Sequence, residues 1–326
     1  MYYYIIAPLI LSLVIALLLG KILIPFLKSI KMGQKILDIG PRWHKSKEGT
    51  PYMGGLLFIS GMLAAVLIFG LMAERKDGNY TDIYTFAMAF FYALVGFIDD
   101  YTKRLKKQNE GLTRTQKFAL QFIPAIVYVV VLKYSEVITS ELFIPFVNIN
   151  IDLGIFYYIC LVFGIVFMVN SVNIHDGIDG MCGTVTSIIM VMYIILFYIA
   201  GNNPGLILAS SCLGGLIGYL YYNYYPAKIF MGDTGSLFLG GLVVGIAIWL
   251  DMPILLVLFG IVYIIDCLSS LLQIAYFKMT GKRIFKIAPF HHRLELYNWS
   301  EYKIVFVAAI ITLVMSAVTI LAMILR

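Results

Sequence analysis

The chain has 326 residues, of which 61% are hydrophobic and only 13% are charged, with a formal net charge of +6. Soluble domains carry about a quarter charged residues, so this composition excludes a soluble enzyme, a disordered chain and a secreted disulfide scaffold. It predicts an all-α polytopic membrane protein that forms a single integral membrane domain over residues 1–326.

Ten apolar runs are long enough to cross a bilayer core, which takes about 20 helical residues. The runs cover residues 3–27, 51–73, 80–98, 118–134, 153–172, 184–200, 205–222, 235–250, 253–276 and 303–325. The first run has no basic stretch before it and no cleavage site after it, which predicts a retained helix instead of a signal peptide. The segment 135–152 mixes polar, β-branched and aromatic residues, and we expect a short hairpin there, outside the bilayer.

The basic residues are distributed unevenly between the two faces that ten spans would create. Loops 28–50, 99–117, 223–234 and 277–303 fall on one face and carry 19 of the 24 Lys and Arg residues. The positive-inside rule makes this face cytoplasmic and places both termini outside. The net charge therefore reflects topology and gives no indication of nucleic-acid binding.

The third run ends in Phe-Ile-Asp-Asp, with Asp99 and Asp100 as its acids. Paired acids at a helix C-terminus face the negative end of the helix dipole and repel each other, whereas a solvated helix end more often carries Lys or Arg. The pair therefore favours metal binding or base catalysis over a purely structural role.

The fifth run ends in the pattern NxxNxxDGxDG, which spaces four polar residues three apart. On a helix, this spacing would place Asn170, Asn173, Asp176 and Asp179 in one stripe. A glycine-rich turn would explain the glycines but not the stripe, and the pattern lacks the loop of an EF-hand.

Asn223 and the stretch Phe230-Met-Gly-Asp-Thr-Gly-Ser precede the eighth run. Asp, Thr and Ser are good helix caps, so capping is one interpretation of this stretch. The other is that the backbone N–H groups of the helix start hold a phosphate while Asp233 carries a cation.

The last basic loop contains His291 and His292 beside Arg293 and Glu295, a group suited to an anionic ligand. The HExxH pattern is absent, so we do not expect zinc there. Residues 42–55 lead into the second run, and their Gly-Thr-Pro and Gly-Gly stretches predict a shaped turn, although the lysines could be topology signals alone.

One cytoplasmic rim thus combines clustered Asp and Asn with basic residues, and the P-loop pattern is absent from the sequence. Carboxylates with phosphate oxygens suit Mg²⁺, and basic side chains suit phosphates. The residues predict Mg²⁺-dependent chemistry on a phosphate compound, with a lipid available from the adjoining bilayer, but they do not identify the sugar.

The motifs, in their order along the chain, resemble the polyprenyl-phosphate N-acetylhexosamine-1-phosphate transferase superfamily, and within it the branch that acts on muramoyl-pentapeptide. The resemblance runs from about Arg42 to Lys303 and includes the ten spans typical of the family. The matching stretches are KxGTPxMGG (47–55), FIDD (97–100), GLTRTQKF (111–118), NxxNxxDGxDG (170–180), FMGDTGS (230–236) and APFHHRLELYNWSE (288–301).

The resemblance implies that undecaprenyl phosphate attacks the sugar-linked phosphorus of UDP-N-acetylmuramoyl-pentapeptide, releasing UMP and forming lipid I for peptidoglycan synthesis. It also implies a Mg²⁺ cofactor held by Asp233, and a homodimer. Asp99 would deprotonate or orient the lipid phosphate, with Asp100 beside it. We expect one step and no phospho-aspartate, because Asp99 has no feature that marks a nucleophile.

The resemblance also assigns substrate-binding roles. Lys47, Lys103 and Lys117 would bind phosphates, and Phe230 would stack on uracil. His291 and His292 would contact the sugar-phosphate side. The remaining cleft residues would be Asn170, Asn173, Asp176, Asp179, Asn223 and Gln273.

This sequence departs from the family pattern at three positions. Arg293 stands where a third His is usual, and Tyr52 and His175 each replace a common Thr. Arg293 keeps a positive charge, so we expect activity to survive.

Three other functions stay open. A sister enzyme would transfer N-acetylglucosamine-1-phosphate to the same lipid. An anion transporter would need charge near the bilayer midplane, where Asp266 is the only carboxylate well inside a predicted span. A structural scaffold would not need such motifs on one rim.

Overall fold

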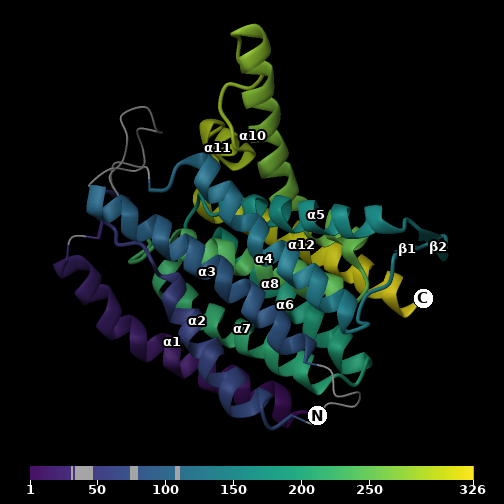
Figure 1. Ribbon diagram of the computed structural model, residues 1–326. Helices are drawn as coiled ribbons and strands as arrows, with labels where there is room; N and C mark the ends of the chain where they lie inside the picture. Colours follow the sequence, from purple (N-terminus) through teal and green to yellow (C-terminus); the bar gives the residue numbers. More distant parts are fainter. Residues whose placement is uncertain (31, 34–46, 74–79, 107–110, 326) are drawn as a thin grey trace.

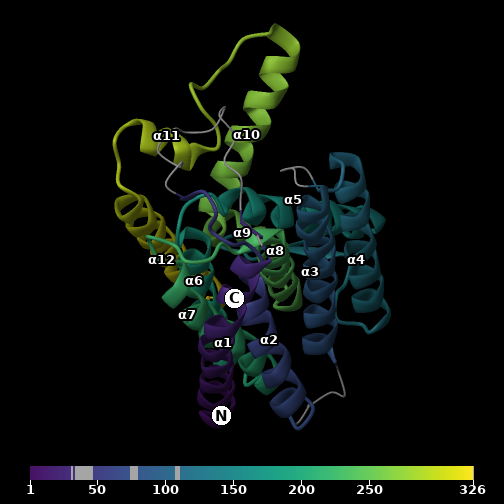
Figure 2. The same cartoon turned by 90° about the vertical axis from the view of Figure 1, so that its left-hand side faces the viewer.

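The computed structural model describes residues 1–30, 32–33, 47–73, 80–106 and 111–325, which form a bundle of helices (Figures 1 and 2). Helix α8 (Gly232–Trp249) is the innermost, with fifteen of its eighteen residues buried. A helix that is apolar all round is stable only when neighbours cover every face, and α3, α5 and α2 pack around this one.

Nine helices in the described part of the chain are long and apolar enough to span a membrane. Besides α8 they are α1 (Tyr3–Ser29), α3 (Thr81–Lys106), α4 (Arg114–Tyr134), α5 (Ile155–His175), α6 (Met181–Ile199), α7 (Asn203–Asn223), α10 (Ile261–Thr280) and α12 (Glu301–Ile324). A shorter apolar helix, α2 (Gly55–Ala65), continues as one π-helical turn, η2 (Val66–Gly70). Nine of the ten predicted runs each coincide with one of these helices, and the remaining run, the ninth along the chain, ends in α10, which confirms the all-α polytopic prediction.

The ninth predicted run, 253–276, is not one straight helix. It begins with a 3₁₀ turn, η3 (Pro253–Leu255), and the short helix α9 (Leu256–Phe259), and α10 starts after Gly260. In both views α10 rises out of the bundle, with α11 (Phe290–Leu296) beside it (Figures 1 and 2). Hydropathy alone does not detect this break, because the residues on both sides of it are apolar.

The segment 135–152 contains the expected hairpin. Strands β1 (Glu141–Ile144) and β2 (Ile149–Asp152) pair antiparallel, with Glu141 opposite Asp152 and Ile144 opposite Ile149. The hairpin and both chain termini lie toward one end of the bundle, and the C-terminal ends of α1 and α3 lie at the other (Figure 1). The assignment of these ends to the outside and the cytoplasm stays a prediction.

Small residues let α8 approach its neighbours closely. A Cβ added at Gly240 would lie 2.6 Å from the Cα of Val169 in α5, and one at Gly241 would lie 2.8 Å from the ring of Tyr92 in α3. A Cβ at Gly96 in α3 would lie 2.2 Å from the carbonyl oxygen of Asp233. This close packing, typical of membrane bundles, brings the end of α3 against the start of α8.

A candidate active site where helices α3, α5 and α8 meet

Three carboxylates from two helices converge where α3 touches the start of α8. Asp99 and Asp100 lie near the C-terminal end of α3, and Asp233 is the second residue of α8. One carboxylate oxygen from each of the three lies within 4.8 Å of the other two, although Asp233 is 133 positions after Asp100 in the sequence. Gly232 before Asp233 has a φ of +73°, a left-handed conformation in which a side chain would be strained.

Asp100 caps helix α8 from a different helix. One carboxylate oxygen accepts hydrogen bonds from the backbone N–H of Thr234 at 2.9 Å and from its hydroxyl at 2.7 Å. The other oxygen accepts from the backbone N–H of Asp233 at 3.2 Å. Helix N-termini leave N–H groups without partners, and here a buried acid satisfies them. The interpretation of the 230–236 stretch as its own helix cap is therefore wrong, because the capping side chain is Asp100 of α3.

Two lysines bring positive charge to the same three acids. The Nζ atoms of Lys103 and Lys117 donate to one oxygen of Asp233 at 2.8 and 2.7 Å, and Lys103 also lies 2.7 Å from Asp99. We call these five residues the Asp–Lys cluster. Three carboxylates against two ammonium groups leave one net negative charge, and the oxygen-only acidic donor set fits a hard divalent cation such as Mg²⁺.

Asn173 connects α5 to the Asp–Lys cluster, because its amide nitrogen donates to Asp233 Oδ1 and to the Ser236 hydroxyl, both at 2.7 Å. Asn170, one turn earlier, instead exchanges hydrogen bonds with Gln121 of α4.

The predicted helical stripe is wrong beyond Asn173, because α5 ends at His175. Asp176 and Asp179 lie in the turn before α6, which Gly180 closes with a φ of +76°.

Lys47 lies between an acid of this turn and an acid at the start of α12. Its Nζ donates to Asp179 at 2.8 Å and to Glu301, the first residue of α12, at 2.7 Å. Burial alone would lower the pKa of Lys47, but the two carboxylates outweigh burial and raise its pKa. Glu301 was not among the predicted site residues, since an acid at a helix start is typically attributed to the helix dipole. The first part of the 42–55 motif, residues 42–46, lies outside the described residues.

The Asp176–Gly180 turn is also hydrogen-bonded to the segment 224–231, which precedes α8, and to the end of α7. Asp179 accepts from the backbone N–H of Ala227 at 2.9 Å. Asn223 accepts from the backbone N–H of Gly180 and donates to the carbonyl of Ile229, each at 2.9 Å. Phe230, half-buried, follows Ile229 directly, so Asp179 of the turn, Asn223 at the end of α7 and Phe230 before α8 belong to one hydrogen-bonded region.

The two histidines of the predicted motif lie against each other, with ring centroids 4.3 Å apart, but have different hydrogen-bond partners. His291 is buried and bonds to Asp266 of α10, as does His175. His292 bonds to Glu295 through Nδ1 at 2.6 Å. Gln273, seven residues after Asp266 and so about 10 Å farther along α10, exchanges hydrogen bonds with the backbone of Phe285.

Asp176 has an acidity that the surrounding structure changes strongly. Burial raises the pKa of Asp176 to about 8, and the negative charges of Asp233, Asp179 and Asp100 act in the same direction. The folded protein therefore holds a proton that the unfolded chain releases near pH 4, so this group destabilises the fold as pH rises from about 4 to about 8. We expect the melting temperature of Asp176→Asn to exceed that of the wild type by a margin that grows over this range. Thermal unfolding in Mg²⁺-free detergent measures it, and a constant difference would contradict the raised pKa.

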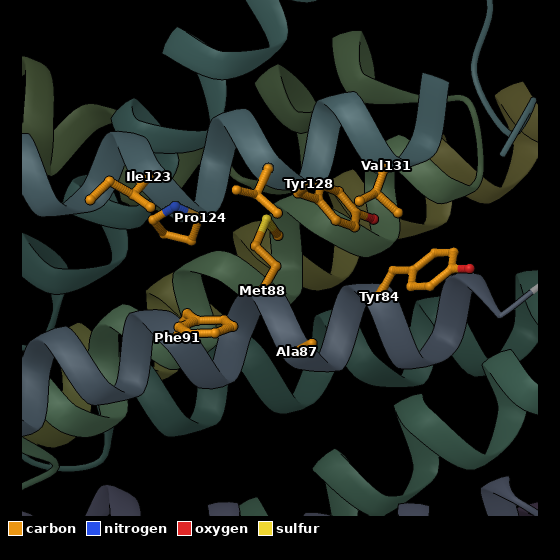
Figure 3. Close-up of a pocket in the computed structure, with 9 residues that line it drawn as sticks. Tyr84, Ala87, Met88, Phe91, Ile123, Pro124, Tyr128 and Val131 are labelled. Carbon is orange, nitrogen blue, oxygen red and sulfur yellow. The ribbon is translucent and has the colours of Figure 1, made fainter. Parts of the chain in front are cut away.

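An apolar pocket of about 180 Å³ lies between α3 and α4 (Figure 3). Its lining includes Tyr84, Met88 and Phe91 from α3 and Ile123 and Tyr128 from α4. None of the lining residues is charged, so the pocket offers contacts for hydrocarbon and has no group to bind a phosphate.

Comparison with known proteins gives consistent matches over nearly the whole chain. The model of glycosyl transferase family 4 matches residues 83–251. A phospho-N-acetylmuramoyl-pentapeptide-transferase of Clostridium acetobutylicum is 40% identical over 323 residues, covering 98% of this chain and 99% of the relative. Proteins of the same name from Clostridium perfringens strain SM101 and Staphylococcus carnosus are 42% and 39% identical, covering 95% and 94% of this chain and 94% and 95% of the relatives.

Proposed function

The chain belongs to the phospho-N-acetylmuramoyl-pentapeptide-transferase family, and from that premise we propose that it transfers phospho-N-acetylmuramoyl-pentapeptide from its UDP conjugate to undecaprenyl phosphate, giving lipid I and UMP. Family membership and the long apolar helices make it a multi-pass transferase of a bacterial cell membrane. The observation that carries the proposal is the Asp–Lys cluster, an acidic centre next to a turn rich in polar side chains.

The chemistry requires that negative charges approach one another. An oxygen of the lipid phosphate forms a bond to the sugar-linked phosphorus, and the bond from that phosphorus to the oxygen of UMP breaks. Lys103 and Lys117 would neutralise the negative charge that accumulates on the reacting phosphates. Their ammonium groups lie together at one oxygen of Asp233, so both positive charges are already held at the Asp–Lys cluster. Asp99, beside Lys103, orients the lipid phosphate or takes its proton.

Positioning is the second contribution that phosphoryl transfer needs from a protein. Asp100 fixes the start of α8, and Asn173 fixes the Asp233 carboxylate from the opposite helix. We assign the uridine and diphosphate to the polar side chains around the Asp176–Gly180 turn, with Phe230 against the base and Lys47 at the phosphates. Binding there requires Lys47 to exchange an acidic partner for phosphate oxygens.

A divalent cation fits the Asp–Lys cluster by its donor chemistry. Asp233 would hold Mg²⁺, together with Asp99 or Asp100 and oxygens of the substrate. When bound, the ion would screen the negative charge of the diphosphate and so favour departure of UMP.

The orientation and the assembly state belong to the same proposal. We place the site on the cytoplasmic face because Lys47, Lys103 and Lys117, which belong to the basic loops, lie in it. A homodimer, implied by the family resemblance, can be tested by measuring the mass of the protein in detergent.

The direct test is UMP release by the purified protein in detergent. We expect release only when undecaprenyl phosphate, UDP-N-acetylmuramoyl-pentapeptide and Mg²⁺ are all present. Release with UDP-N-acetylglucosamine alone would make the chain a sister enzyme, and no release with either nucleotide would reject the proposal.

A further inference from the structure

A second polar cluster lies in the described part of the chain, on the other side of the last turn of α5. His175, Asp266 and His291 come from α5, α10 and α11, and their side chains are 2 to 4% exposed. We call them the His–Asp cluster. The family resemblance gives a role to His291 alone, and the proposed reaction does not use the other two.

One carboxylate oxygen joins the two imidazole rings. Oδ2 of Asp266 lies 2.6 Å from Nδ1 of His175 and 3.0 Å from Nδ1 of His291. The other oxygen accepts the backbone N–H of His291 at 3.1 Å. Separations this short are those of hydrogen bonds, whereas nitrogen and oxygen ligands about 2 Å from a shared metal ion would lie farther apart. The cluster is therefore a hydrogen-bonded unit.

These bonds determine which edge of the His291 ring meets a ligand. A carboxylate facing Nδ1 requires a proton on that atom and leaves Nε2 for other partners. Nε2 of His291 is buried and has no hydrogen-bond partner among the described residues. It points at the Asp176–Gly180 turn, since a Cβ on Gly177 would lie 2.2 Å from it. Other buried side-chain polar atoms in the described part of the chain also lack a hydrogen-bond partner, and Nε2 of His175 is one of them. We take Nε2 of His291 as the one that meets a ligand, because it faces the turn where we place the sugar diphosphate.

His175 in turn holds the carboxylate. Its ring lies edge-on to Tyr263, one turn before Asp266 on α10, with ring centroids 4.8 Å apart. The hydroxyl of Tyr263 is hydrogen-bonded to Thr186 at 2.7 Å, so the support extends into α6. His175 thus restrains the carboxylate that orients His291.

We propose that Asp266 and His175 are positioning residues that hold His291 with Nδ1 protonated and Nε2 directed at the sugar-diphosphate side of the cleft. The inference rests on the proposed function, because that function places the sugar diphosphate at this turn. It gives a role to Asp266, the buried acid that was otherwise expected only in a transporter. It also gives a role to His175, which stands where the family resemblance predicts threonine.

Asp266→Asn tests the acid with almost no change of shape. The amide oxygen must stay on the backbone N–H of His291, so the amide NH₂ faces both rings and requires a bare nitrogen at each Nδ1. We expect kcat to fall about 10- to 100-fold, with the Kd for UMP and the melting temperature unchanged. The ¹⁵N spectrum of a chain with only four histidines should show Nδ1 of His291 protonated in the wild type and bare in the variant.

His175 is tested by a pair of variants. The amide nitrogen of asparagine falls near the position of Nδ1 in histidine, so His175→Asn keeps a donor to Asp266, whereas His175→Leu does not. We expect His175→Leu to lower kcat about tenfold and His175→Asn to restore most of it. Tyr193→Phe, which removes a buried hydrogen bond to the carbonyl of Val243, is the matched control and should lower stability without changing kcat.

Several results would overturn the proposal: a kcat for Asp266→Asn close to that of the wild type, equal losses in both His175 variants, or losses that follow the melting temperature as in the control. Wild-type protein that releases no UMP would instead reject the proposed function. The ¹⁵N spectrum needs no substrate, so it would still decide whether Asp266 fixes the proton on Nδ1.

Discussion

Replacing Asp233 with asparagine is expected to lower kcat at least about 1,000-fold, the value of several kcal/mol of lost charge stabilisation. Asp233 accepts hydrogen bonds from Lys103 of α3, Lys117 of α4 and Asn173 of α5, so side chains from three helices hold its carboxylate. Asparagine keeps the shape but removes the charge that balances both lysines and would bind a cation. UMP release at increasing Mg²⁺ concentrations measures the loss.

Binding of Mn²⁺, followed by its electron paramagnetic resonance signal, provides a readout that does not depend on turnover. We expect Asp233→Asn to lose this binding. Asp152→Asn changes an exposed carboxylate on the hairpin in the same way and should bind and react normally. Turnover of Asp233→Asn that still rises with Mg²⁺ would exclude Asp233 as the ligand.

Asp99→Asn is expected to lower kcat by about 10²- to 10⁴-fold, the usual contribution of a positioned acid–base group. One oxygen of Asp99 faces Lys103 at 2.7 Å, and the other accepts the backbone N–H of Leu112 at 2.8 Å. Asparagine can keep the bond to Leu112, so the fold should tolerate the change while the charge beside the lipid phosphate is lost. The rate is measured with saturating nucleotide sugar and varied undecaprenyl phosphate.

Asp100→Asn is the informative comparison, because Asp100 is the residue next to Asp99 but has a different role. Its carboxylate caps α8 through Thr234, so we expect that variant to lose melting temperature as well as activity. If Asp99→Asn turned over at nearly the wild-type rate, Asp99 could not be the base. If both variants lost stability equally, Asp99 would have a structural role.

Much of the fold could be predicted because hydrophobicity along the chain determines which segments leave water. The ten runs follow from that property, and the hairpin follows from the mixture of polar, β-branched and aromatic residues between two of them. The break at Gly260 could not be predicted in the same way, since α9 and α10 are both apolar and their directions depend on neighbours in space.

The sequence indicates which residues belong to the candidate site, but not which of them contact one another. Asp99 and Asp233 attract notice as polar residues beside apolar runs and Lys117 through the family resemblance, yet only tertiary structure shows that Lys117 reaches Asp233. Glu301 and His175 gave weaker signals, because a helix-start acid and a lone histidine have ordinary explanations. Their partners are 254 and 91 residues away, a separation that no local pattern encodes.

The cap that Asp100 provides for α8 has a consequence for how such a protein can acquire resistance to compounds that bind its cleft. Substitutions that alter the acidic end of α3 also remove the hydrogen bonds that join it to α8. A substitution at Asp100 that weakens binding of such a compound is therefore expected to lower both the activity and the stability of the protein.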